Sequence, residues 1–246
     1  YEIAQCLVGS EMCIRDSSNT GSMVIRDSKF ISNSTSDADI SAALYNAGEL
    51  TIYDSSFENN TTLNANLGGA IYNNGKTLNL VAENRNVKFS GNTAGGVSNG
   101  ITNNGGTINL NGTQGMKIVF DDKIATVDGS TNNILNINST PTGAAGSAPD
   151  DAGTAVTVYL NNNIQNHAIN HYAGSLVVAD DSYLNTNSLN LAGGILDIAN
   201  GKLGNVVLQD FSVTKDSKIN FDANLVDTGA GFGTSDLITI NGTASV

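Results

Sequence analysis

The sequence contains little cysteine and little proline. Only two of its 246 residues are cysteine and two are proline, and both cysteines, Cys6 and Cys13, lie within the first 17 residues. The chain beyond Ser17 is therefore free of cysteine, so no disulfide can stabilise it. This suits a chain that is exported and has to stay unfolded until it has crossed a membrane.

Positive charge is scarce as well. The 11 lysine and arginine residues face 23 aspartate and glutamate residues, and the net charge is -12. Because a basic stripe cannot be built from so few cations, we expect no nucleic-acid partner. An anionic membrane surface would repel the chain.

Long apolar runs are also missing. No stretch approaches the roughly 18 consecutive apolar residues of a transmembrane helix, so we expect no membrane insertion of this chain. No signal peptide is recognisable at the start. We interpret the chain as an internal piece of a longer protein.

What the sequence has in excess is asparagine and glycine, with 35 and 27 residues respectively. Asparagine tolerates left-handed backbone conformations and can form side-chain ladders between stacked strands. Glycine permits tight corners. The composition therefore favours β structure with many turns.

One phrase of the sequence occurs three times. Residues 22–33 return as residues 49–60 after about 27 positions, and a third copy ends at residues 87–92, about 32 positions further on. A period of about 20–50 residues is typical of stacked repeats. The matched residues of the first two copies are Ile25 and Ile52, Asp27 and Asp54, Phe30 and Phe57, and Asn33 and Asn60.

A second phrase lies between the copies. It reads Ala-Leu-Tyr-Asn-Ala-Gly at residues 43–48, Ala-Ile-Tyr-Asn-Asn-Gly at residues 70–75 and Gly-Ile-Thr-Asn-Asn-Gly at residues 100–105. Asn-Gly between strands often marks a hairpin. A hairpin meander, however, does not require the same Phe, Asn and Gly at equivalent places in successive units, whereas strands that return above their predecessors do.

The fold class that we predict is all-β, as a right-handed parallel β-helix, a solenoid of roughly 8–11 rungs. Leu50 and Ile52 should point to one side of a strand, with Thr51 and Tyr53 on the other. The repeat blurs from residue 107, but the alternation continues to Ile240. We expect one β-helix over residues 18–246, with a loop insertion at residues 140–153 and no helix.

Residues 1–17 do not share the repeat. The part from Cys6 to Ser17 resembles a translated adapter or assembly scar, so we treat residues 1–17 as a non-native segment. The alternative is a real N-terminal cap closed by a Cys6–Cys13 disulfide. At the other end we expect an uncapped stack that exposes strand edges and aggregates when isolated.

Two short motifs carry a family resemblance. Within residues 22–105, Phe-x-x-Asn occurs three times, and Gly-Gly-Ala-Ile occurs once intact and twice in degraded form. Their alternation resembles the repeat of polymorphic outer membrane proteins, a branch of the autotransporters. The motif residues are Phe30, Asn33, Phe57, Asn60, Gly68, Gly69, Ala70, Ile71, Phe89 and Asn92.

The resemblance implies a β-helical passenger domain on the bacterial cell surface, in the outer membrane or outside the cell, and a C-terminal β-barrel in the parent protein. It also associates both motifs with adhesion, so the ten motif residues are candidate binding residues. A structural interpretation fits them at least as well. Phe would fill the core, Asn would turn a corner or join a ladder, and Gly-Gly would permit a close turn.

We also consider an enzyme acting on polysaccharides, a lyase or hydrolase, which needs clustered carboxylates. The acidic pairs are Asp121-Asp122, Asp150-Asp151 and Asp180-Asp181. Adjacent residues of a strand face opposite sides, so each pair offers one carboxylate to a face. We expect these residues to be solvated turn residues, and we expect no enzyme.

Neither a metal nor a cofactor is expected. His167 and His171 are the only histidines, and in a strand they would lie roughly 13 Å apart on one face. We expect both at exposed corners. Residues 229–236 resemble a single Ca²⁺-binding nonapeptide, but such sites need tandem copies.

The function that we expect is that of a surface-exposed or secreted passenger fragment, acting as an adhesin or a structural stalk. Its partner would be a host surface protein or a glycan, held by many weak contacts along one face of the stack. A spacer that holds another domain away from the cell is a third interpretation.

Overall fold

The computed structural model describes residues 2–3, 17–35, 41, 43–139, 155–179, 184–199, 205–224 and 234–246. These residues form strands joined by turns, and none of them is helical. The predicted loop at 140–153 and a Cys6–Cys13 disulfide lie outside the described residues. All-β structure without helix is therefore confirmed for the described part of the chain.

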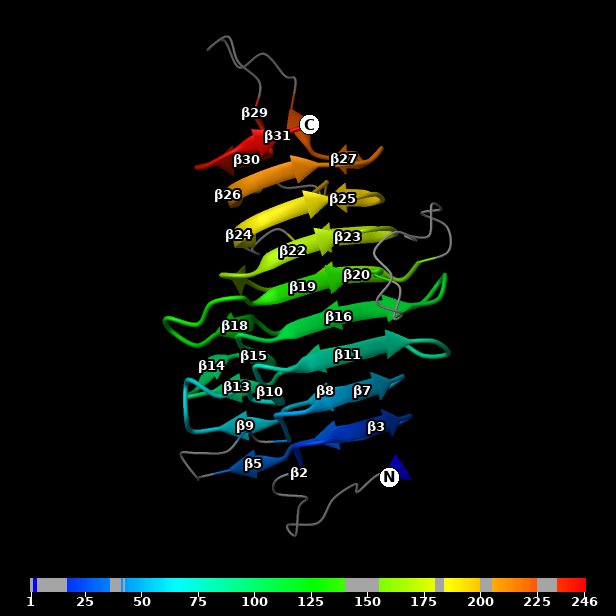
Figure 1. Cartoon of the computed structure of the whole chain (residues 1–246), viewed down its shortest axis with the longest axis vertical. Helices are drawn as coiled ribbons and strands as arrows, with labels where there is room; N and C mark the ends of the chain where they lie inside the picture. The colour runs from blue at the N-terminus through cyan, green and yellow to red at the C-terminus, as the bar shows by residue number, and fades with distance from the viewer. Residues whose placement is uncertain are drawn as a thin grey trace.

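The largest sheet has 17 strands in two columns that lie side by side (Figure 1). The first column contains β2 (Ser17–Asn19), β6 (Leu44–Asn46), β10 (Ile71–Asn74), β15 (Ile101–Asn104), β18 (Ile124–Thr126), β21 (Ile164–Gln165) and β30 (Leu237–Ile240). The second contains β1 (Glu2–Ile3), β3 (Ser22–Arg26), β7 (Glu49–Tyr53), β11 (Thr77–Ala82), β16 (Thr107–Gly112), β19 (Ile134–Ile137), β22 (Ala168–His171) and β31 (Ala244–Ser245). The longer strands β24 (Leu184–Leu191) and β26 (Asn205–Val213) span both columns.

The described residues also form three smaller sheets. The eight-stranded sheet contains β4 (Lys29–Ile31), β8 (Ser56–Glu58), β12 (Val87–Ser90), β17 (Lys117–Phe120), β20 (Thr157–Leu160), β23 (Ser175–Val178), β25 (Ile195–Asp197) and β27 (Lys218–Asn220). The four-stranded sheet contains β5 (Ser34–Thr35), β9 (Thr61–Thr62), β13 (Thr93–Ala94) and β14 (Val97–Ser98). The strands β28 (Ala223–Asn224) and β29 (Thr234–Ser235) form a two-stranded sheet.

Almost every strand pair is parallel, and the registers follow the sequence repeat. Ile25 pairs with Ile52, and Phe57 pairs with both Phe30 and Phe89. Among the described strands, only the pairs β13–β14 and β28–β29 are antiparallel. The parallel pairing that the repeat predicted is thus confirmed, and Asn-Gly does not close hairpins between the repeated strands.

The interior is one continuous apolar cluster from Ile25 to Leu208. Side chains alternate as predicted, since Leu50 and Ile52 are fully buried and Thr51 and Tyr53 are half-buried. Left-handed residues turn the corners between sheets, and they recur with the repeat. Asp27 and Asp54 have φ values of 48° and 51°, a conformation that Asp and Asn tolerate better than most residues.

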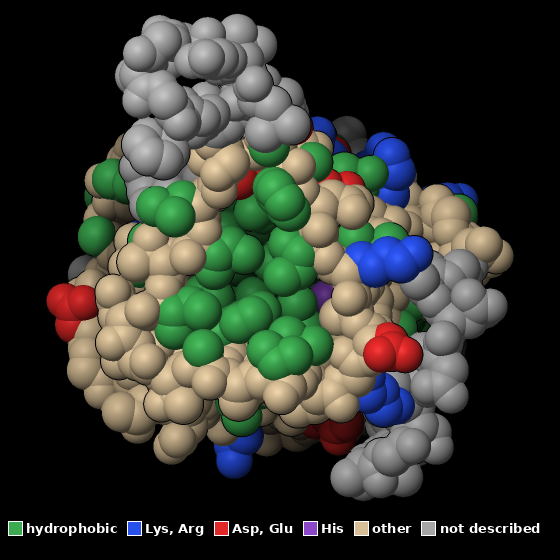
Figure 2. All heavy atoms as spheres, turned by 90° about the horizontal axis from the view of Figure 1, so that it is seen from above, with side chains coloured by type: hydrophobic (Ala, Val, Ile, Leu, Met, Phe, Trp, Pro, Cys, Tyr) green, Lys and Arg blue, Asp and Glu red, His purple; other side chains and the backbone are tan. Residues whose placement is uncertain are grey.

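The apolar interior reaches the surface at the C-terminal end. Figure 2 views the molecule from this end and shows a central apolar area ringed by polar side chains and backbone. Phe221 and Leu237 are 58% and 56% exposed there, and Ile219 and Ile238 are only partly buried. Unpaired apolar edges of this kind can template association. Aggregation of the isolated chain stays a prediction.

Candidate functional site

The phenylalanines of the Phe-x-x-Asn motif form a stack inside the molecule. The ring centroids of Phe30 and Phe57 and those of Phe57 and Phe89 are 4.7 Å apart, and Phe120 continues the stack at 5.0 Å. Neighbouring rings are almost parallel, because strands in register place identical side chains above one another. Phe57, Phe89 and Phe120 are fully buried, and Phe30 is half-buried.

The asparagines of the same motif form a hydrogen-bonded ladder. Nδ2 of Asn33 donates to Oδ1 of Asn60 over 2.7 Å, and Nδ2 of Asn60 donates to Oδ1 of Asn92 over 2.8 Å. The last donor, Nδ2 of Asn92, bonds Oδ2 of Asp122. Each amide of Asn60 and Asn92 also bonds the carbonyl of the phenylalanine in the preceding copy, Phe30 or Phe57. This ladder, the first ladder, fixes the asparagine side chains and ties them to the backbone of the phenylalanines.

A second ladder crosses the first column of the large sheet. Asn19 donates to Asn46, Asn46 to Asn73 and Asn73 to Asn103, over 2.7–2.9 Å. Nδ2 of Asn103 then lies 3.3 Å from Nε2 of His167. These asparagines are not among the residues that the sequence predicted for a site. Their recurrence at positions 46, 73 and 103 of the second phrase would have indicated the ladder.

The two ladders run in the same direction, and each ends on a buried acceptor. Nδ1 of His167 lies 2.7 Å from the Gln165 carbonyl, which can only accept, so this ring nitrogen carries the proton and Nε2 accepts from Asn103. Burial lowers the pKa of His167 to about 4, against the opposing effect of that carbonyl. Burial likewise raises the pKa of Asp122, which hydrogen bonds from Asn92 partly offset.

The structure corrects three expectations. His167 and His171 are not at exposed corners, because both are fully buried. Asp122 is not a solvated turn residue either, because only 2% of it is exposed, while Asp121 beside it points outward to Lys88 at 3.2 Å. The last amide of an asparagine ladder needs an acceptor for its N–H group. The sequence repeat aligns only residues of the same type, so it could not identify Asp122 as that acceptor. Asp150-Asp151 and Asp180-Asp181 lie outside the described residues.

His171 occupies an inward apolar position. It pairs in register with Ile137 on one side and Leu191 on the other. The ring lies beside the backbone of Ala173 and Gly174, yet neither ring nitrogen reaches a hydrogen-bond partner among the described residues. Burial lowers the pKa of His171 to about 4, so the ring is neutral at pH 7.

The Gly-Gly-Ala-Ile motif serves close packing. A Cβ at Gly68 would collide with the carbonyl oxygen of Ile71, and a Cβ at Gly69 would collide with the backbone of Thr93 and Asn99. Gly68, Gly69, Ala70 and Ile71 are all buried. Of the ten motif residues, only Phe30 and Asn33 are half-buried, so the geometry supports the structural interpretation of both motifs.

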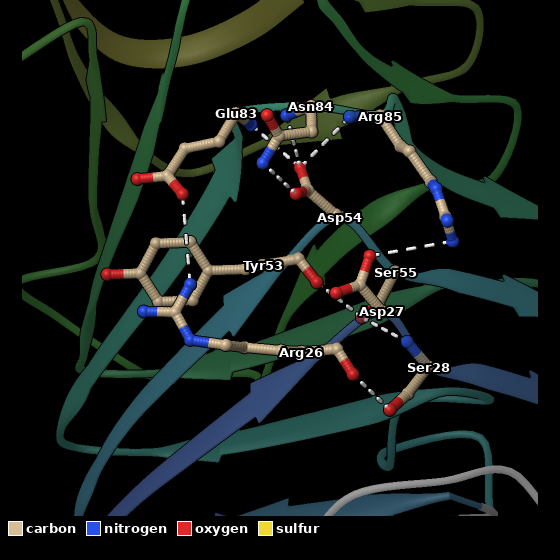
Figure 3. Close-up of polar contacts among 9 residues, drawn as sticks. All are labelled: Arg26, Asp27, Ser28, Tyr53, Asp54, Ser55, Glu83, Asn84 and Arg85. Atoms are coloured by element: carbon tan, nitrogen blue, oxygen red, sulfur yellow. Dashed lines mark hydrogen bonds and ion pairs between the residues drawn. The ribbon is translucent and has the colours of Figure 1, made fainter.

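Charged side chains gather at one corner between the large sheet and the eight-stranded sheet (Figure 3). The Arg26 guanidinium lies 3.6 Å from the centroid of the Tyr53 ring and 3.7 Å from Glu83. Arg85 lies 3.5 Å from Asp27. Each cation has an acidic partner, and exposed pairs of this kind contribute little to stability. The two arginines of the corner therefore pair with Glu83 and Asp27 of the same chain.

Asp54 lies beneath this corner and holds the following loop. Its Oδ1 accepts hydrogen bonds from the backbone N–H groups of Glu83, Asn84 and Arg85 over 2.7–3.2 Å (Figure 3). Burial alone would raise the pKa of Asp54, but these bonds outweigh it and lower the pKa below its usual value. Such a carboxylate is fully occupied by its own chain, so it is a structural residue.

A third set of asparagines faces outward from the second column of the large sheet. Asn109 donates to Asn79, Asn136 to Asn109 and Asn170 to Asn136 over 2.8–2.9 Å, and Asn190 follows in register above Asn170. All five side chains are half-buried. We call the outward side of β11, β16, β19, β22 and the second half of β24 the asparagine face.

The asparagine face was not predicted from the sequence, although the sequence contains a pattern that indicates it. Each of its asparagines stands between two inward residues, as in Leu78-Asn79-Leu80 and Leu135-Asn136-Ile137. The triplet recurs five times at the strand spacing. Its other outward residues are Thr77, Val81, Thr107, Ile134, Ala168, Ser188 and the nearly buried Asn111, which is in register with Val81.

Other site types find little support in the part of the chain that the structure describes. It contains no group of three or more His, Cys, Asp and Glu residues that could hold a metal ion. It also contains no apolar helix long enough to span a bilayer. Comparison with known proteins adds no assignment, because no family model, no curated protein and no solved structure matches this chain.

Proposed function

We propose that the chain is a right-handed parallel β-helix and serves as a bacterial surface passenger domain of the autotransporter type, similar to polymorphic outer membrane proteins. Parallel registers that repeat from β3 to β26 support the β-helix. Asparagine ladders and a phenylalanine stack stabilise such a fold without disulfides. That property suits a chain that folds after export, at the cell surface or outside the cell.

The proposed activity is adhesion to a host surface protein or glycan. The observation that carries it is the asparagine face, where one polar group recurs on five neighbouring strands without a charged side chain between them. Many weak contacts along such a row add by avidity. The motif residues contribute by holding the strands in register, not by touching the partner.

An alternative role as a polysaccharide-active enzyme has less support. Such enzymes need carboxylates that converge on a substrate. The corner of Figure 3 brings three carboxylates together, but Asp54 accepts hydrogen bonds from backbone N–H groups and Asp27 and Glu83 pair with arginines. These carboxylates are not free to act on a sugar.

Adhesion can be tested with beads coated with the full chain and incubated with epithelial monolayers. We expect saturable attachment that excess soluble chain competes away. Albumin-coated beads are the control. Attachment no greater than theirs would reject adhesion and leave the stalk as the remaining passenger function.

A further inference from the structure

We propose that the asparagine face binds a neutral polysaccharide chain. This inference rests on the proposed function, because it names the class of partner that an adhesive β-helix would hold. It concerns the outward side of five consecutive strands, which lie one above another in Figure 1.

The first argument is charge. The protein carries a net charge of -12, yet the outward residues of the asparagine face are Asn, Thr, Ser, Ala, Ile and Val. Charges lie at its borders, where Asp210 is in register with Ser188 above and the exposed Glu49 stands on β7, the strand below β11. The surrounding negative charge repels an anionic partner, and the face itself has no carboxylate that could pair with a cationic one. A neutral partner fits both conditions.

The second argument is hydrogen-bonding capacity. A side-chain amide has two N–H donors and two acceptor lone pairs. The ladder engages one donor and one acceptor of Asn109 and of Asn136, which leaves one of each to face outward. Sugar hydroxyl groups also donate and accept together, so a row of amides and a row of hydroxyls are matched. The ladder bonds hold the amides in place before binding, which reduces the entropy lost on association.

The third argument is shape and repetition. Neighbouring strands of a sheet lie about 4.8 Å apart, so the amides form a regular row. Small Thr, Ser and Ala residues flank it, and Ile134 and Val81 add apolar area for the C–H faces of sugar rings. An extended chain of identical neutral units presents repeated contacts to a repeated surface, and weak contacts then add.

The test uses the full chain and hydroxyethyl cellulose, a soluble neutral polymer, in affinity electrophoresis. We expect retardation that grows with polymer concentration. Carboxymethyl cellulose, which has the same backbone with negative charges, should retard the protein at least tenfold less. Binding to both polymers alike, or to neither, would overturn the inference.

Substitutions locate the site. The triple variant Asn109→Ala, Asn136→Ala, Asn170→Ala should weaken retardation at least tenfold. The matched control is Asn74→Ala with Asn104→Ala, which removes another outward amide pair, joined over 3.0 Å, from the neighbouring column of the same sheet. Thermal unfolding midpoints establish that both variants fold. A triple variant that folds and binds normally would overturn the inference, as would an equal loss in the control.

The outcome can be separated from that of the adhesion assay. Beads that attach to cells while the chain ignores hydroxyethyl cellulose would reject the polysaccharide and retain adhesion. The same triple variant should then be tested on beads. If size-exclusion chromatography shows the wild-type chain to be a dimer that the triple variant abolishes, the face binds a second copy instead and the inference fails.

Discussion

The levels built from β6 to β17 differ from those built from β24 to β31. The first set has two interior asparagine ladders and a phenylalanine stack, so polar bonds and apolar packing act on the same strands. In the second set the buried side chains of the described residues include no asparagine, and they are aliphatic apart from Thr186 and Asp236. Its last strands also leave Phe221 and Leu237 exposed.

The difference teaches how register is fixed. Sliding one strand past another by one residue turns every inward side chain outward, so burial alone already opposes a slip. A buried ladder adds a second penalty, because each displaced amide loses a bond in a place where water cannot replace it. We infer that the levels from β6 to β17 are held more firmly than those from β24 to β31.

The largest expected effect comes from the phenylalanine stack. Phe57→Ala should lower the free energy of unfolding by about 4 kcal/mol, because it opens a cavity between two other rings. Leu237→Ala, at an exposed position of the second set, should change it by less than about 0.5 kcal/mol. Urea denaturation measures both. Equal losses would remove the distinction between the two regions.

The next effect is a dependence on pH. His167 and His171 have ordinary pKa values of 6.5 that burial lowers to about 4. As the pH falls, the histidines of the unfolded chain take up protons at a higher pH than the buried histidines of the folded chain. The free energy of unfolding is therefore at its full value above pH 6.5 and falls as the pH drops toward 4, by at most about 3 kcal/mol for each histidine. Asp54, with a lowered pKa, adds a loss only below its usual value of 3.8.

Variants assign this pH dependence. His171→Leu should remove one histidine's share of the slope between pH 6.5 and pH 4 while packing between Ile137 and Leu191. Unfolding midpoints in urea at several pH values give the slope. A slope unchanged by His171→Leu would contradict the burial of a neutral ring.

A smaller effect should follow from cutting the second ladder. Asn73→Ala leaves one N–H of Asn46 and the acceptor of Asn103 unpaired in the interior, while the other N–H of Asn46 still bonds the Thr77 carbonyl. We therefore expect a loss of about 2 kcal/mol in the free energy of unfolding. The outward Asn79→Ala removes the same side chain where water can replace its bonds, and should change stability by less than about 0.5 kcal/mol. Similar losses would mean that burial adds nothing to a ladder.

The smallest change in stability is expected at the open C-terminal end. Phe221→Lys with Leu237→Lys alters two exposed side chains, so unfolding should shift by less than about 0.5 kcal/mol. Self-association should nevertheless fall, because charge at a strand edge discourages pairing. Light scattering against concentration measures this. Unchanged association would place the contact elsewhere.

Much of this architecture could be predicted from the repeat. Phe30 and Phe57 occupy the same place in two copies of the repeat, which predicted the register of β4 on β8. The alternation of apolar and polar residues predicted which side chains are buried. The acceptors at the ladder ends could not be predicted. Asp122 and His167 lie where the repeat blurs, and His167 meets Asn103 across 64 positions of the chain. Only the folded structure brings such unlike residues together.

Native-state hydrogen exchange tests most directly whether the ladders hold the first set of levels. Backbone amides of β10, β11, β15 and β16 should exchange at least tenfold more slowly than those of β24 and β26, and Asn73→Ala should bring the two sets closer. Equal protection in the wild-type chain, or faster exchange in the ladder strands, would contradict this view.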